Sequence, residues 1–88
     1  MSKSAQEIKS AIDVVAEAAK IHSDDRIFEM VAMMEAKPKR SADERAVLVA
    51  LYQVIESRHD VDAAMDAWAA DLNSNLTYGQ ALAKAVGR

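Results

Sequence analysis

The sequence predicts an all-α fold, a compact bundle of four to five short amphipathic helices that forms a single domain over residues 1–88. The 88 residues include only two glycines and one proline, so few positions interrupt a helix. Several segments begin with residues that favour the N-terminus of a helix. After these residues, apolar side chains recur with the 3.6-residue period of a helix. No alternating polar and apolar run is bounded by turn residues, so we expect no strands.

Helix-start signals divide the chain into segments. A hydroxyl residue followed three positions later by Glu or Gln has the spacing of a capping box, and this spacing occurs at Ser4, Ser41 and Thr77. Ser23 is a further expected N-cap, because two acidic residues follow it in the first turn, where the helix dipole favours negative charge. These signals predict helices over residues 5–21, 24–36, 42–57 and 78–86.

The first two of these segments are expected to be separate helices. Ile8 and Ile27 lie on the apolar stripes of the two segments. In one continuous helix, the 19 residues between them would rotate the stripes by roughly 100° relative to each other. We therefore expect a break near His22 and Ser23. A single bent helix over residues 5–36 is the alternative.

A further helix is expected between residues 61 and 72. Asp60 is its predicted N-cap, and an Asn- and Ser-rich turn follows it at residues 73–75. Pro38 marks the connection before residue 42, and Gly87 suits the C′ position of the last helix. We expect the third and fourth helices to pair as a hairpin, with the fifth closing one end of the bundle.

The expected core is drawn from the apolar stripes of all five helices. Its members are Ile8, Ile12, Val15, Ile27, Val31, Met34, Leu48, Leu51, Ile55, Val61, Met65, Trp68, Leu72 and Leu82.

Composition and motifs exclude several classes of function. The absence of cysteine excludes disulfides and thiolate metal sites. The formal net charge of -3 argues against electrostatic nucleic-acid binding, which needs a basic excess. The sequence carries neither a nucleophile motif nor a phosphate-binding loop, so we expect no enzymatic activity and no cofactor. Neither a secretory signal nor a run of roughly 20 apolar residues is found, so we expect a cytoplasmic location and no membrane partner.

The predicted helix over residues 24–36 has an unusually wide apolar face. Its members are Ile27, Phe28, Met30, Val31, Met33 and Met34. They span roughly 220° of the helical wheel, whereas a surface helix needs somewhat more than about 100°. The helix is therefore either the central helix of the bundle or in contact with another chain. Because methionine is frequent on adaptable binding surfaces, Phe28 and the three methionines are candidate contacts to a partner protein or to a second copy in a homodimer.

An acidic face on the predicted fourth helix is the second candidate contact. Asp62 and Asp66 lie four residues apart, so they share one face of a helix and could imitate the phosphates of a nucleic acid. The leading hypothesis is a small non-enzymatic protein-binding module, acting as an adaptor, regulator or inhibitor through the Met-rich face, the acidic face or both.

Two alternative functions stay open. Lys37, Lys39 and Arg40 form a dense basic run, which could contact phosphates in a nucleic-acid regulator. Glu56 and His59 have the Glu-x-x-His spacing that places two metal ligands on one helix face, so a homodimer could hold a metal. We favour a solvated helix end for this pair and expect no metal.

Overall fold

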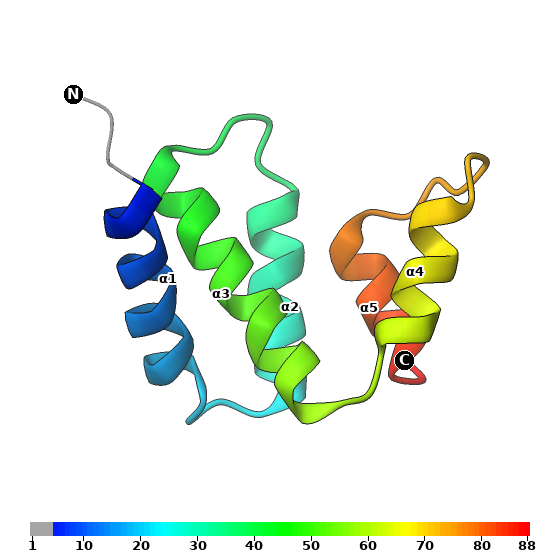
Figure 1. Ribbon diagram of the computed structural model, residues 1–88, viewed down its shortest axis with the longest axis horizontal. Helices are drawn as coiled ribbons and strands as arrows, with labels where there is room; N and C mark the ends of the chain where they lie inside the picture. Colours follow the sequence, from blue (N-terminus) through cyan, green and yellow to red (C-terminus); the bar gives the residue numbers. More distant parts are fainter. Residues whose placement is uncertain (1–4) are drawn as a thin grey trace.

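Five helices make up the computed structural model, which describes residues 5–88 (Figure 1). They are α1 (Ala5–Ala19), α2 (Asp24–Glu35), α3 (Ala42–Arg58), α4 (Asp62–Ala70) and α5 (Tyr78–Ala85). No strand occurs among residues 5–88, so the all-α prediction is confirmed. Helices α1, α2 and α3 lie side by side, and α4 and α5 form a hairpin next to them (Figure 1). None of the described helices is long and apolar enough to cross a bilayer.

Local capping signals locate the starts of three helices as predicted. Ser23 Oγ accepts a hydrogen bond from the backbone N–H of the third residue of α2. Ser41 and Thr77 each form a complete capping box at the starts of α3 and α5. These contacts satisfy N–H groups that have no partner within the helix. The predicted cap at Ser4 lies outside the described residues.

The break between the first two helices is confirmed, but the predicted end of the first helix and the predicted start of the fourth helix are wrong. Helix α1 ends at Ala19, so Ile21 lies in the following turn and is 85% exposed. Asp60 does not cap α4. Val61 occupies the N-cap position. Its apolar side chain cannot cap the helix and is buried in the core.

The end of α4 also differs from the prediction. The helix stops at Ala70, because Asp71 is extended and its carboxylate accepts a hydrogen bond from Asn73 N at 3.0 Å. An aspartate that bonds the backbone two residues ahead makes a turn in place of another helical turn. Leu72 therefore points into solvent and is 95% exposed, so its assignment to the core is wrong.

The core forms around α3, not around α2. Helix α3 packs against α1, α2 and α5, so the alternative in which the second helix is the central one is wrong. Buried as predicted are Ile27, Val31, Leu48, Leu51, Ile55, Val61, Met65 and Leu82. Met34 and Trp68 are half-buried against this core. Ile8, Ile12 and Val15 are only half-buried, because α1 lies at one side of the bundle and packs mainly against α3.

Helix α4 pairs with α5 and not with α3, so the predicted hairpin of the third and fourth helices is wrong. Both connections of α4 are short, and a short connection allows either neighbour to pack against it. Aromatic packing favours α5, because the Trp68 ring meets the Tyr78 ring edge-on with centroids 5.6 Å apart.

A polar cluster joins the end of α3 to the start of α2. Asp24 Oδ1 accepts a hydrogen bond from Arg58 Nη1 at 2.8 Å, and His59 Nε2 lies 2.7 Å from Asp24 Oδ2. Arg58 also donates to the backbone carbonyls of Lys20 and His22. The hydrogen bonds from Arg58 and His59 hold the pKa of Asp24 below its ordinary value. The cluster therefore fastens the α1–α2 turn to α3 through an ionised carboxylate.

We expect the contribution of Asp24 to stability to disappear in acid. Its folded-state pKa lies below its unfolded value of 3.8, so the stabilisation is complete above the unfolded pKa and is lost as pH falls through the folded pKa. The difference in unfolding free energy between wild type and Asp24→Asn, measured in urea, should shrink as the pH falls from about 6 to about 2. A difference that stays constant over this range would contradict the assigned role of the carboxylate.

Candidate functional site

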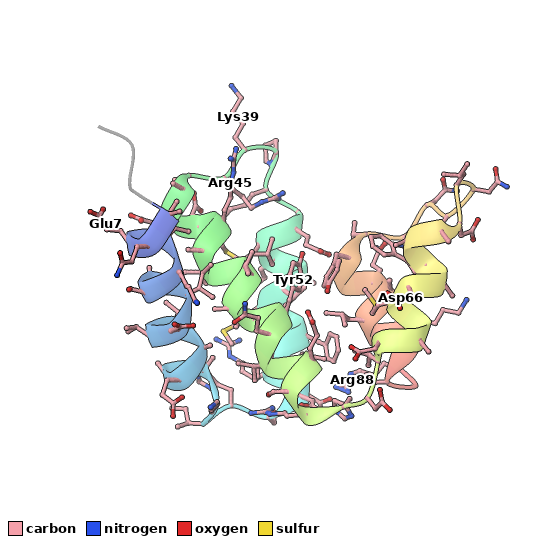
Figure 2. All side chains as sticks on the ribbon, in the orientation of Figure 1. Glu7, Lys39, Arg45, Tyr52, Asp66 and Arg88 are labelled. Atoms are coloured by element: carbon pink, nitrogen blue, oxygen red, sulfur yellow. The ribbon has the colours of Figure 1, made fainter. Side chains whose placement is uncertain are left out.

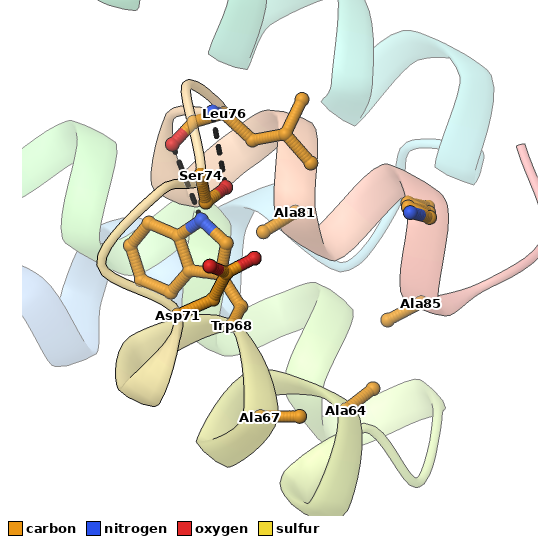
Figure 3. Close-up of a pocket in the computed structure, with 9 residues that line it drawn as sticks. Ala64, Ala67, Trp68, Asp71, Ser74, Leu76, Ala81 and Ala85 are labelled. Carbon is orange, nitrogen blue, oxygen red and sulfur yellow. Dashed lines mark hydrogen bonds between the residues drawn. The ribbon is translucent and has the colours of Figure 1, made fainter.

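A surface groove runs between α4 and α5 and opens to solvent (Figure 3). Its volume is about 470 Å³. It is lined by Ala64, Ala67, Trp68, Asp71, Ser74, Leu76, Ala81, Lys84 and Ala85. We refer to it as the α4–α5 groove.

Four alanines create the space in this groove. Ala64 and Ala67 come from α4, and Ala81 and Ala85 come from α5. Residues three or four positions apart share one face of a helix, so each helix turns a strip of methyl groups toward the groove. Larger side chains at these positions would fill the space between the helices. The alanines leave it open, and they give it an apolar floor.

One wall of the groove is held in place by hydrogen bonds. Trp68 Nε1 donates to the carbonyl oxygen of Leu76 at 3.2 Å, and Leu76 N donates to Ser74 Oγ at 3.3 Å (Figure 3). The Tyr78 ring also contacts the indole, in an edge-on arrangement. The indole therefore needs little rearrangement on binding, which limits the entropy lost when a ligand docks against it.

Two leucines of the connection between α4 and α5 are exposed. Leu76 lines the groove and is 38% exposed, and Leu72 directly follows the lining residue Asp71. Single exposed leucines are common on protein surfaces. Leu76, however, is exposed within an apolar groove, and an exposed apolar patch of this kind is typical of an interaction site.

The chain between His59 and Lys84 is acidic. This stretch contains four aspartates and no lysine or arginine, whereas the rest of the chain carries 11 basic and 10 acidic residues. Asp71 lies in the groove lining, where Lys84 is the basic residue. Asp62 and Asp66 are exposed on α4, and Asp66 is labelled in Figure 2. They lie roughly 160° to 200° around the helix from Ala64, so they are on the face of α4 that points away from the groove.

Glu35, the last residue of α2, positions α5 and thereby the groove. Its carboxylate accepts hydrogen bonds from Tyr52 OH, from Thr77 Oγ1 at 2.6 Å and from Gly79 N at 2.9 Å. A carboxylate in this position is favourable because the N-terminus of a helix carries partial positive charge. Helix α5 is thus capped by Thr77 and also by Glu35, which lies 44 positions before Gly79 in the sequence.

Two tyrosines hold the hairpin against α3. The rings of Tyr52 and Tyr78 lie 4.6 Å apart, and Tyr78 OH donates to Glu56 Oε1 at 2.8 Å. Burial, followed by the hydrogen bond to Glu35, raises the pKa of Tyr52 far above its ordinary value. Burial and the hydrogen bond to Glu56 raise the pKa of Tyr78 to about 12. Both hydroxyls therefore stay protonated and able to donate at neutral pH.

The Met-rich face of α2 is open only in part. Phe28, Met30 and Met34 are half-buried and pack against the core. The Arg88 guanidinium lies over the Phe28 ring, 4.9 Å from its centroid. Met33 is 63% exposed. The core and Arg88 together cover most of the wide apolar face, and Met33 is the predicted contact residue that is open to a partner.

The predicted basic run is partly used within the fold. Lys37 forms an ion pair with Glu44, which lowers the pKa of Glu44 to about 2. Arg40 Nη1 donates to the carbonyl oxygens of Met34 at 3.2 Å and Lys37 at 3.3 Å, a common way to satisfy the carbonyls at a helix end. Lys39 projects from the α2–α3 loop (Figure 2). Of the three predicted phosphate contacts, Lys39 is therefore the most accessible.

Glu56 and His59 do not converge on one point. Glu56 accepts the hydrogen bond from Tyr78, and His59 contacts Asp24. Among residues 5–88, no three potential metal ligands of the His, Cys, Asp or Glu type come together. In this structure the two side chains connect α3 to α5 and to α2.

No protein family matches the chain, and neither a curated protein nor a solved structure shows significant similarity to it. The groove described above was not predicted from the sequence. Its signal is present in the spacing of Ala64 with Ala67 and of Ala81 with Ala85. These pairs become a site only because α4 packs against α5.

Proposed function

We propose that this protein is a small non-enzymatic protein-binding module, an adaptor, regulator or inhibitor, that holds a segment of a partner protein in the α4–α5 groove. The observation that carries the proposal is an open groove that is lined by four alanines, by the fixed Trp68 ring and by the exposed Leu76. Tryptophan is among the residues that contribute most binding energy at protein interfaces.

The shape of the groove favours a protein segment over a small molecule. Small-molecule pockets enclose about 70–90% of the surface of their ligand, whereas this groove is open to solvent. Apolar grooves on helical proteins commonly receive an apolar strip of a partner. The strip would pack between the methyl groups of the two helices and against the Trp68 ring.

Filling the groove should abolish partner binding without unfolding the protein. Ala67→Leu adds bulk inside the groove. Ala69→Leu adds the same bulk at an exposed position outside the lining, which lies roughly 200° around α4 from Ala67. Tagged versions of wild type and of both variants would be used to capture partners from a nuclease-treated lysate of the source cells, with circular dichroism as the folding check. We expect wild type and Ala69→Leu to retain the same protein, and the amount retained by Ala67→Leu to fall by at least about tenfold.

A Met33→Glu variant in the same capture separates the groove from the exposed part of α2. Loss of the partner with Met33→Glu but not with Ala67→Leu would transfer the binding site to α2 and overturn the groove assignment. Material that is recovered only when nuclease is left out would favour a nucleic-acid function and direct attention to Lys39.

A further inference from the structure

We infer that the segment bound in the α4–α5 groove is a basic amphipathic helix. This inference rests on the proposed function and adds the chemistry of the partner. Two properties of the site support it. Among residues 5–88, the aspartates on and next to α4 have no ion-pair partners, and the backbone groups along the sides of α4 and α5 are mostly used within the helices.

Acidic side chains elsewhere in the protein commonly have basic neighbours. Ion pairs join Glu17 to Lys20, Glu29 to Arg26, Glu44 to Lys37, Asp24 to Arg58 and Asp25 to Arg88. Within the described residues, no ion pair involves the four aspartates between His59 and Lys84. In the part of the chain that the structure describes, the stretch around α4 therefore carries four acidic charges without an ion-pair partner, two of them on the helix and one next to each of its ends.

Asp71 acts on the groove at close range, and the other three aspartates act on it at longer range. Asp62 and Asp66 lie on the far side of α4, about one helix diameter of roughly 10 Å from the groove, which is close to the screening length of about 8 Å at physiological salt. Asp71 is in the lining itself, and one oxygen of its carboxylate accepts the Asn73 N–H. Lys84 offsets only part of this charge. A partner with lysine or arginine beside its apolar strip is the electrostatic complement.

The walls of the groove favour a helix over an extended peptide. An extended peptide leaves its backbone N–H and C=O groups in need of partners, which a sheet edge can supply. Helices α4 and α5 use most of their backbone groups internally, so their sides offer no such edge. A helix satisfies its own backbone, and its ridge of side chains can enter the groove between two other helices. The small alanine side chains of α4 and α5 allow the partner helix to approach both helices closely.

Three synthetic peptides would test the inference with purified protein. The first is an amphipathic helix with leucines on one face and lysines on the other, the second carries glutamates in place of the lysines, and the third is a scrambled lysine peptide with no apolar face. Trp68 is the only tryptophan and lines the groove, so its fluorescence reports on the site. Amide chemical shifts would locate the bound peptide.

We expect the amphipathic lysine peptide to bind at least about tenfold more tightly than either control peptide, to shift the amides of the groove alanines, and to weaken as salt is raised. Asp71→Asn should weaken it severalfold, and the double variant Asp62→Asn with Asp66→Asn should lower mainly the association rate. Asp13→Asn removes one charge from the exposed surface of α1, and it should have little effect.

Equal binding of the lysine and glutamate peptides, or shifts confined to α1–α3, would overturn the inference. The inference would also be overturned if the scrambled peptide bound as strongly as the amphipathic one. Its lysines would then suffice for binding, without an apolar face that enters the groove. A captured partner that is lost with Ala67→Leu but bound normally by all the aspartate variants would leave the proposed function standing and reject the basic helix. A lysine peptide that binds wild type and Ala67→Leu equally would reject the groove as its site.

Discussion

Gly79→Ala should destabilise the protein by about 1–3 kcal/mol, as expected for overpacking. This result runs against helix propensity, because replacing a helical glycine with alanine ordinarily stabilises a helix by about 0.5–1 kcal/mol. A Cβ at Gly79 would lie 2.4 Å from Val31 Cγ1 and 2.8 Å from both carboxylate oxygens of Glu35. Helix α5 would have to move away from α2, which would break the hydrogen bond from Gly79 N to Glu35. Urea unfolding measures the change.

A double-mutant cycle identifies the close contact as the cause. Val31→Ala removes the methyl group that the new Cβ would meet, so the combined Val31→Ala and Gly79→Ala variant should lose less stability than the sum of the two single losses. A gain in stability for Gly79→Ala alone, as at an ordinary helical glycine, would contradict the tight packing of α5 on α2.

Glu35→Ala should cost about 2–4 kcal/mol of unfolding free energy, because it leaves three donors without their acceptor. Gly79 N and Tyr52 OH are both in partly buried surroundings, where water cannot fully replace the lost carboxylate. Glu35→Gln keeps an acceptor oxygen and removes the charge, so its loss should be smaller. Thermal and urea unfolding would give the free energies.

Glu29→Ala is the matched control for this prediction. Glu29 is on the same helix, its side chain is 63% exposed, and it pairs with Arg26 one turn earlier. Exposed pairs of this kind contribute little, so we expect a change within about 0.5 kcal/mol. Similar losses for Glu35→Ala and Glu29→Ala would show that Glu35 does not fasten α5.

The parts of the fold that depend on local chemistry could be predicted from the sequence. A capping box joins residues three positions apart, so Ser41 and Thr77 identify their helix starts without knowledge of the rest of the chain. Periodicity likewise places Ile27, Ile55 and Leu82 in the core. Leu72 fits the same period but is exposed, because the turn formed by Asp71 ends α4 before it.

The arrangement of the helices depends on contacts between distant residues. The capping of α5 by Glu35 and the packing of Trp68 on Tyr78 have no signature in residue spacing. Periodicity also gives most weight to large apolar residues, so it emphasised the Met-rich face of α2. The groove is made by alanines, and a site formed from small side chains becomes visible only once the pairing of α4 with α5 is known.

The capping of α5 by Glu35 also bears on the order in which the protein assembles. Helix α5 has eight residues and α4 has nine, and isolated helices shorter than about 12–15 residues are marginal in water. The acceptor for Gly79 N comes from α2, so α5 gains this bond only after α2 is in place. We therefore expect the α4–α5 hairpin to form after the folding transition state and to open before the rest of the protein. Glu35→Ala should then accelerate unfolding and leave the folding rate nearly unchanged.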